Sequence, residues 1–167
     1  CHCLVGSEMC IRDRYNIKYQ NKHKLDLVDE ILSNVDVIPN SIVLAQAAIE
    51  SGWGKSRFAK EYNALFGEYT YDDSEGVIPL ERENGDTHLI KAFSSYSNSV
   101  KSYFDNINSH YAYEDFRDIR NIMRKRNNFS NVNLLVNKLS TYAEDENYIK
   151  TIRPVSYTHL RAHETVA

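Results

Sequence analysis

Apolar residues recur at helical spacing over much of the chain. The first periodic stretch predicts an amphipathic helix over residues 25–35, and Pro39 separates it from the next element. Residues 42–50 are apolar on almost every side, which is typical of a buried helix, and Glu50 stands in its last turn. Helical spacing returns over 97–107, 113–123, 134–142 and 148–152, which predicts packing helices in the second half of the chain.

The pattern changes between residues 68 and 93. β-type residues cluster at 69–71, 77–78 and 88–90, and Asn84-Gly85 is a turn signal between the last two clusters. Before this segment, Ser56 is a good N-cap for a short helix over 57–62. We therefore predict a mainly α fold of the α+β class, in which a helical domain carries a small β-hairpin lobe.

Composition and charge narrow the classes of function. The chain has 167 residues, 42% of them hydrophobic, which suffices for one domain with a core. Its net charge of -3 gives no sign of a nucleic-acid-binding surface, which is typically basic. We interpret the basic cluster Arg120, Arg124, Lys125 and Arg126 as the solvated side of a helix; the alternative is contact with an anionic wall polymer or a membrane surface.

The two ends of the chain differ from its middle. All 3 cysteines lie at positions 1, 3 and 10, and the segments 1–14 and 155–167 resemble translated sequencing-adapter read-through. We expect both segments to be non-native and residues 15–154 to form the domain. That domain has no cysteine for a disulfide or a thiol nucleophile. The terminal cysteines with His159 and His163 lack the spacing of a metal site.

The candidate chemistry lies at the end of the apolar helix. Burial there would raise the pKa of the Glu50 carboxyl and keep it protonated, as a general acid requires. Gly52 and Gly54 can end the helix and let a ligand approach the backbone. Between them stands the only tryptophan, Trp53, which either offers a flat face to a sugar ring or fills the core, as large aromatics usually do.

Several separated motifs carry a family resemblance. Residues 48–54 (AIESGWG), 63–67 (NALFG) and 142–145 (YAED) resemble the glucosaminidase domains that cut bacterial peptidoglycan, glycoside hydrolase family 73. Segments 76–79, 99–103 and 108–120 suggest the branch of that family typified by the Bax protein. The resemblance implies a lysozyme-like fold, Glu50 as the essential acid and a functional Tyr142. It also implies a substrate groove that includes Ser51, Trp53, Asn63, Phe66 and Tyr148.

Glycoside hydrolysis generally needs a second group that faces the anomeric carbon. The family places a second acid on the β lobe, where the candidates are Glu75 and Glu81. Family members carry this glutamate in a Thr-Glu-Tyr motif, whereas Glu81 stands between Leu80 and Arg82. Assistance from the N-acetyl group of the substrate is the third option.

We therefore predict a peptidoglycan hydrolase, an endo-β-N-acetylglucosaminidase that cuts the β-1,4 bond after N-acetylglucosamine in peptidoglycan or a related amino-sugar polymer. The alternatives are a lytic transglycosylase or muramidase-type enzyme and a non-catalytic module that binds wall glycan. We expect no cofactor, no metal, no nucleic-acid partner, no membrane span and a monomer. An extracytoplasmic location, periplasmic or associated with the cell wall, follows from the expected substrate alone.

Overall fold

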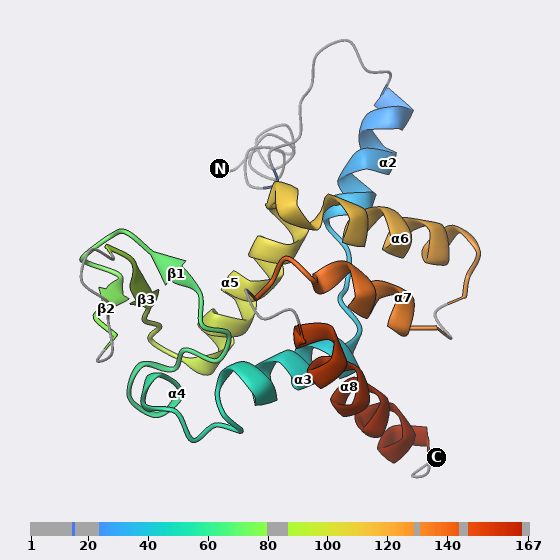
Figure 1. The fold of residues 1–167 in the computed structure, drawn as a ribbon. Coiled ribbons are helices and arrows are strands. Elements are labelled where there is room, and N and C mark those ends of the chain that lie inside the picture. Colours follow the sequence, from blue (N-terminus) through green and yellow to red (C-terminus); the bar gives the residue numbers. More distant parts are fainter. Residues whose placement is uncertain (1–14, 16–23, 80–86, 129–130, 144–146, 165–167) are drawn as a thin grey trace. The chain divides into compact units, whose positions relative to one another are not determined.

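The computed structural model describes residue 15 and residues 24–79, 87–128, 131–143 and 147–164 (Figure 1). Contacts within the chain divide it into two compact units. The first, here called the α6 unit, comprises Cys1–Pro39 and Asp105–Pro154; the second, the Glu50 unit, comprises Asn40–Phe104 and Val155–Ala167. Helices α5 (Tyr96–Ser109) and α8 (Tyr148–Glu164) contribute residues to both units.

Helix α6 (Glu114–Lys125) is the centre of the α6 unit. It contacts α2 (Lys24–Asn34), the 3-10 helix η1 (Tyr111–Tyr113), α7 (Asn133–Val136) and the 3-10 helix η2 (Asn137–Leu139) (Figure 1). Acidic residues occupy the first turn of α6 and basic residues its last turn, a distribution that matches the helix dipole. The apolar core of this unit includes Phe116, Leu135, Val136 and Leu139, all fully buried.

A buried guanidinium joins α6 to the chain that follows α2. Arg120 has no exposed surface, and its Nη1 donates to Asn108 Oδ1 at 2.7 Å. Its Nη2 donates to the carbonyl of Ser33 at 2.8 Å, and its Nε lies 3.8 Å from Asp36 Oδ2. Burial lowers the pKa of Arg120 to about 10, while the charge of Asp36 acts in the opposite direction. The guanidinium is therefore still charged at neutral pH.

The interpretation of the basic cluster as one solvated helix side was wrong for Arg120. Arg120 is 0% exposed, and Arg124 is held by the Asp36 carboxylate through both Nε and Nη2. Two of the four cations in the cluster therefore serve the packing of α6. The sequence pattern could not distinguish the buried arginine from the solvated ones. The difference depends on an acidic partner, and the local sequence does not show where that partner lies.

The Glu50 unit contains the helices and strands around the predicted site. Helix α3 (Asn40–Glu50) precedes α4 (Arg57–Tyr62), and Ser56 caps α4 as predicted, because its Oγ accepts from the Ala59 amide at 3.1 Å. Burial of α3 is one-sided rather than complete: Ile42 is fully buried, whereas Leu44 is 45% exposed.

The β lobe is a small antiparallel sheet. Strands β1 (Tyr69–Thr70), β2 (Gly76–Val77) and β3 (Leu89–Lys91) form the order β1-β3-β2 (Figure 1). Tyr69 lies opposite Ile90, and Gly76 lies opposite Lys91. The sheet confirms the predicted β segment; the predicted Asn84-Gly85 turn lies outside the described residues. Helices with a small antiparallel sheet confirm the predicted mainly α, α+β class and are consistent with a lysozyme-like fold.

Gly76 is packed too tightly to carry a side chain. An added Cβ would lie 2.5 Å from Leu89 Cβ and 2.8 Å from Thr70 Cγ2. We expect Gly76→Ala to lower the free energy of unfolding by about 1–3 kcal/mol, because the sheet must open to admit the methyl group. Urea denaturation measures this, with the exposed Thr87→Ala as control. Equal stability of the two variants would contradict the packing.

Within the described part of the chain, no helix is both long and apolar enough to cross a membrane.

Candidate active site

Glu50 is the last residue of α3. Its Oε1 is excluded from solvent, whereas its Oε2 lies on the side of Gly67, where an added Cβ would stand 3.7 Å from that oxygen. Gly67 is exposed and has a φ of 61°. One carboxyl oxygen is thus buried, and the other lies beside a backbone that carries no side chain. The absence of a side chain at Gly67 lets the backbone lie close to that second oxygen.

The chain makes a left-handed turn directly after Glu50. Residues 52–54 have φ angles of 57°, 59° and 71°, and the amide of Trp53 donates to the carbonyl of Ala48 at 2.6 Å. In this bond the sixth residue of the segment 48–53 donates to the first. Such a bond closes a helix that ends in a residue with left-handed backbone. The predicted role of Gly52 and Gly54 as helix terminators is therefore confirmed.

Ser51 holds this turn together. It is only 2% exposed, and its hydroxyl donates to the carbonyl of Ala47 at 2.5 Å while accepting from the amide of Gly54 at 2.8 Å. The hydroxyl is thus occupied within the chain. Ser51 thus shapes the loop that carries Trp53, and its direct binding of the substrate stays a prediction.

Trp53 is 64% exposed, which excludes the interpretation that it fills the core. Its φ of 59° is an uncommon conformation for a bulky side chain, since left-handed backbone costs an L-residue roughly 1–2 kcal/mol. Strained backbone of this kind persists where the surrounding structure enforces it, and it is concentrated at functional sites. An exposed indole three residues from Glu50 is available to a ligand.

The segment after α4, residues 63–68 and here called the wall, lies beside the end of α3 at Gly67. Asn63, with φ 52°, caps α4, and its Nδ2 donates to the carbonyl of Phe93 at 2.9 Å. Phe66 is 2% exposed and stacks on Tyr103 with ring centroids 4.2 Å apart. The ring of Phe66 is thus buried in this structure, and its place in the groove stays a prediction. Asn63 and Phe66 thus attach this segment to Phe93 and to Tyr103.

Glu68 is a half-buried acid that the sequence pattern did not single out. Its Oε1 is excluded from solvent, and its Oε2 accepts a hydrogen bond from the Ser102 hydroxyl at 2.8 Å. It follows Gly67 directly, so it belongs to the same wall. Its position directly after the NALFG segment was the available signal.

Of the two predicted second acids, the structure describes Glu75. Its side chain is 54% exposed and lies 3.5 Å from the ammonium group of Lys91, which pairs in the sheet with the next residue, Gly76. An exposed pair of this kind contributes little to stability, so Glu75 is free to exchange Lys91 for another partner at small cost. Glu81 lies outside the described residues.

The predicted tyrosines lie in the α6 unit. Tyr142 is half-buried, and its ring stacks on Tyr148 with centroids 5.9 Å apart and an interplanar angle of 11°. The ring of Tyr113 lies near Tyr142 as well, with centroids 6.1 Å apart. Tyr148 is 4% exposed, so it supports Tyr142 and offers little surface to a substrate. The structure thus brings Tyr142 and Tyr148 together, and it separately brings together Glu50 and the wall at Gly67.

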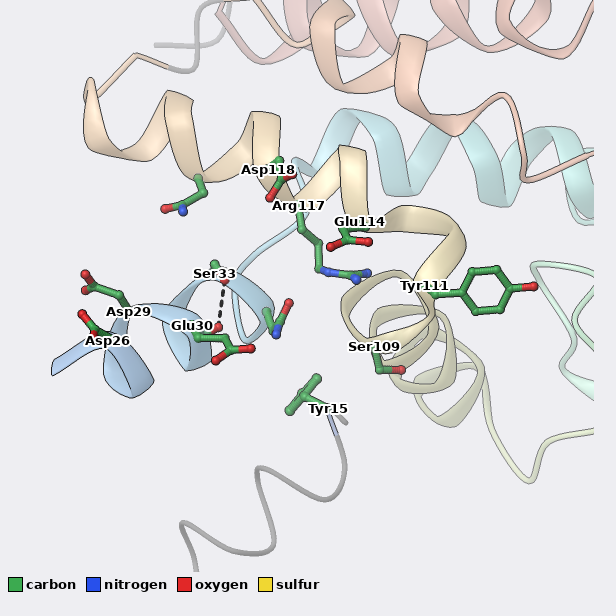
Figure 2. A pocket seen from close by; sticks show the side chains of 12 residues that line it. Tyr15, Asp26, Asp29, Glu30, Ser33, Ser109, Tyr111, Glu114, Arg117 and Asp118 are labelled. Atoms are coloured by element: carbon green, nitrogen blue, oxygen red, sulfur yellow. Dashed lines mark hydrogen bonds between the residues drawn. The ribbon is translucent and has the colours of Figure 1, made fainter. Parts of the chain in front are cut away.

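A groove of about 690 Å³ lies in the α6 unit between α2 and α6 (Figure 2). Five of the residues that line it are acidic, namely Asp26, Asp29, Glu30, Glu114 and Asp118. Arg117 reaches into it, and burial lowers the pKa of that guanidinium. None of the predicted site residues lines this groove, so its size does not make it the candidate active site.

Comparison with known proteins decides the family. The profile described as mannosyl-glycoprotein endo-beta-N-acetylglucosaminidase, named Glucosaminidase, matches residues 25–159. This chain belongs to the glucosaminidase family. The matched range contains Glu50, both candidate second acids and Tyr142, and it runs past the predicted domain boundary at residue 154. The non-native origin of the two ends stays a prediction.

Curated relatives of this glucosaminidase domain include two kinds of protein. Protein bax of Escherichia coli strain K12 is 34% identical over 133 residues, which cover 80% of this chain and 47% of that protein. Peptidoglycan hydrolase FlgJ of the same strain is 33% identical over 93 residues, 48% of this chain and 29% of FlgJ. FlgJ of Salmonella typhimurium is 32% identical over 93 residues, 48% of this chain and 29% of that protein. The chain thus spans less than half the length of these relatives. No solved structure matches it significantly.

Proposed function

We propose that this glucosaminidase domain is a peptidoglycan hydrolase, an endo-β-N-acetylglucosaminidase that cuts the β-1,4 bond after N-acetylglucosamine. The observation that carries the proposal is the Glu50 carboxyl, with one oxygen buried and the other beside the open backbone at Gly67. The family and the name of the FlgJ relatives, peptidoglycan hydrolase, support this substrate. The site of action would then be extracytoplasmic, because peptidoglycan lies outside the cytoplasm.

In the proposed reaction, protonated Glu50 donates its proton to the glycosidic oxygen as the bond from that oxygen to the anomeric carbon breaks. Water then supplies a hydroxyl to the anomeric carbon, and its remaining proton restores the acid directly or through a second group. Glu75, Glu81 and the N-acetyl group of the substrate remain the candidates for that second group. Glu75 is exposed and only loosely paired, so it can turn toward a substrate.

Trp53 is proposed to stack on a sugar ring of the glycan strand. Aromatic faces bind the apolar faces of sugars, and the indole is exposed next to the proposed acid. Tyr142 is proposed as a second functional aromatic residue on the strength of its match to the family motif. Tyr142→Phe should lower turnover while Tyr157→Phe, an exposed tyrosine of α8, should not.

Trp53→Gly provides a test in which stability and binding move in opposite directions. Glycine adopts a φ of 59° without strain, so the variant should be as stable as the wild type or more stable by up to about 1 kcal/mol. Loss of the stacking face should raise KM for soluble glycan fragments by about tenfold. Thermal unfolding and steady-state kinetics measure the two effects, and an unchanged KM would remove Trp53 from the site.

Mass spectrometry of digested sacculi tests the proposed bond. An endo-β-N-acetylglucosaminidase adds water and leaves a reducing N-acetylglucosamine end. An anhydro-muramoyl end would instead identify a lytic transglycosylase. Binding to sacculi with no released fragment would identify a non-catalytic wall-binding module and overturn the enzymatic proposal.

A further inference from the structure

One side of helix α5 holds the wall that faces Glu50. The Ser99 hydroxyl accepts from the amide of Leu65 at 3.1 Å, and the Ser102 hydroxyl donates to Glu68 at 2.8 Å. Phe66, which lies between Leu65 and Glu68 in the sequence, stacks on Tyr103 of α5. Residues 65, 66 and 68 are thus each attached to α5, and Gly67, which lies among them, faces Oε2 of Glu50.

Tyr103 also holds the helix that carries Glu50. Its hydroxyl donates to Gln46 Oε1 at 2.5 Å, and both side chains are fully buried. Gln46 stands four residues before Glu50 on α3, and residues at this spacing lie on the same helix face, one turn apart. The bond therefore fixes the rotation of α3 about its own axis one turn before Glu50.

Tyr103 contacts both sides of the site, the α3 side through Gln46 and the wall through Phe66. It cannot touch a substrate, because it has no exposed surface. We propose that Tyr103 is a positioning residue, which sets the distance and direction of the Glu50 carboxyl relative to Gly67. The inference rests on the proposed function, since it assigns a role within the same site.

The expected effect is on turnover rather than on substrate affinity. Misplacing a reacting group by about 1 Å costs up to about 10²-fold in rate, whereas sugar-binding surfaces that do not move keep their affinity. We therefore expect Tyr103→Phe to lower kcat by about tenfold or more and to change KM by less than about twofold. The variant keeps the ring that stacks on Phe66 and loses only the hydroxyl.

Loss of one partner of a buried hydrogen bond also destabilises the fold, so stability must be separated from positioning. The double variant Tyr103→Phe/Gln46→Met replaces both partners by apolar groups, which is often nearly neutral for stability. Its denaturation midpoint should return toward the wild-type value. Its kcat should stay low, because an apolar contact does not fix the rotation of α3 as a directional hydrogen bond does.

The test compares kcat and KM of these variants on soluble peptidoglycan fragments, at a temperature where circular dichroism shows each to be folded. Ile107→Val is the control, since it removes one methylene from a fully buried side chain one turn further along α5. The proposal predicts low kcat for both Tyr103 variants and wild-type kcat for the control. Wild-type kcat in the double variant, or an equal loss in Ile107→Val, would overturn it. A wild-type protein that releases no fragments would overturn the proposed function itself, so the two failures are distinct.

Discussion

Glu50→Gln should lower kcat by about 10²–10⁴-fold and leave the fold intact, because the amide cannot donate the proton that the leaving oxygen needs. The amide has nearly the same size and shape as the carboxyl, so the buried Oε1 position stays filled. Release of fragments from purified sacculi, followed by mass spectrometry, measures the loss. Circular dichroism and thermal unfolding confirm that the variant is folded.

A matched control for this variant is Glu61→Gln on α4, which changes an exposed glutamate of the same unit. It should keep wild-type turnover. Glu75→Gln and Glu81→Gln, measured in the same assay, separate the candidates for the second group: a loss confined to one of them identifies that residue, and a loss in neither favours the N-acetyl group. Retained lysis in Glu50→Gln would remove the catalytic assignment.

The largest effect on stability is expected for Arg120→Met. The substitution leaves Asn108 Oδ1 and the carbonyl of Ser33 without the guanidinium that now donates to them, and it removes the fully buried one of the two cations beside Asp36. Each buried acceptor left without its donor costs about 1–3 kcal/mol, so we expect a total loss of about 3–5 kcal/mol. Because the pKa of Arg120 is about 10, the pair is intact at neutral pH and the full cost should appear there.

Arg124→Met is the matched control, since Arg124 binds the same Asp36 carboxylate but its side chain is 47% exposed. Water can solvate Asp36 in place of this exposed guanidinium, so we expect the free energy of unfolding to fall by about 1 kcal/mol or less. Guanidinium chloride denaturation of both variants gives the comparison. Equal losses would show that burial of Arg120 adds nothing to the stability of the α6 unit.

Several elements could be read from local pattern alone. The spacing of apolar residues placed α2, α3, α5 and α6 close to their observed bounds, and Ser56 placed the start of α4. These predictions succeeded because helical periodicity and capping depend on residues within a few positions of each other. The glycines at 52 and 54 likewise identified the left-handed turn, since their conformational freedom is a property of the residue itself.

The burial of individual polar residues could not be read in the same way. Ser51 and Asn63 belong to motifs that the family resemblance connects with substrate, yet the Ser51 hydroxyl closes a turn and the Asn63 amide reaches Phe93, thirty positions away. Arg120 looked like a solvated charge until its partner Asp36 was placed beside it, and the contact of Glu68 with Ser102 joins residues 34 positions apart. In each case the deciding contact joins residues or backbone that the local pattern does not connect.

The sequence by itself determined the family, the helical class with its small sheet, and Glu50 as the proposed acid at a helix end, because these depend on local spacing and on motifs in order. Only the tertiary structure decided that Trp53 is exposed while Phe66 is buried, that one oxygen of Glu50 is covered and the other faces Gly67, and that Tyr103 joins Gln46 to Phe66. The physical reason is that solvent exclusion and hydrogen-bond partnership are properties of packed neighbours, which come from distant parts of the chain.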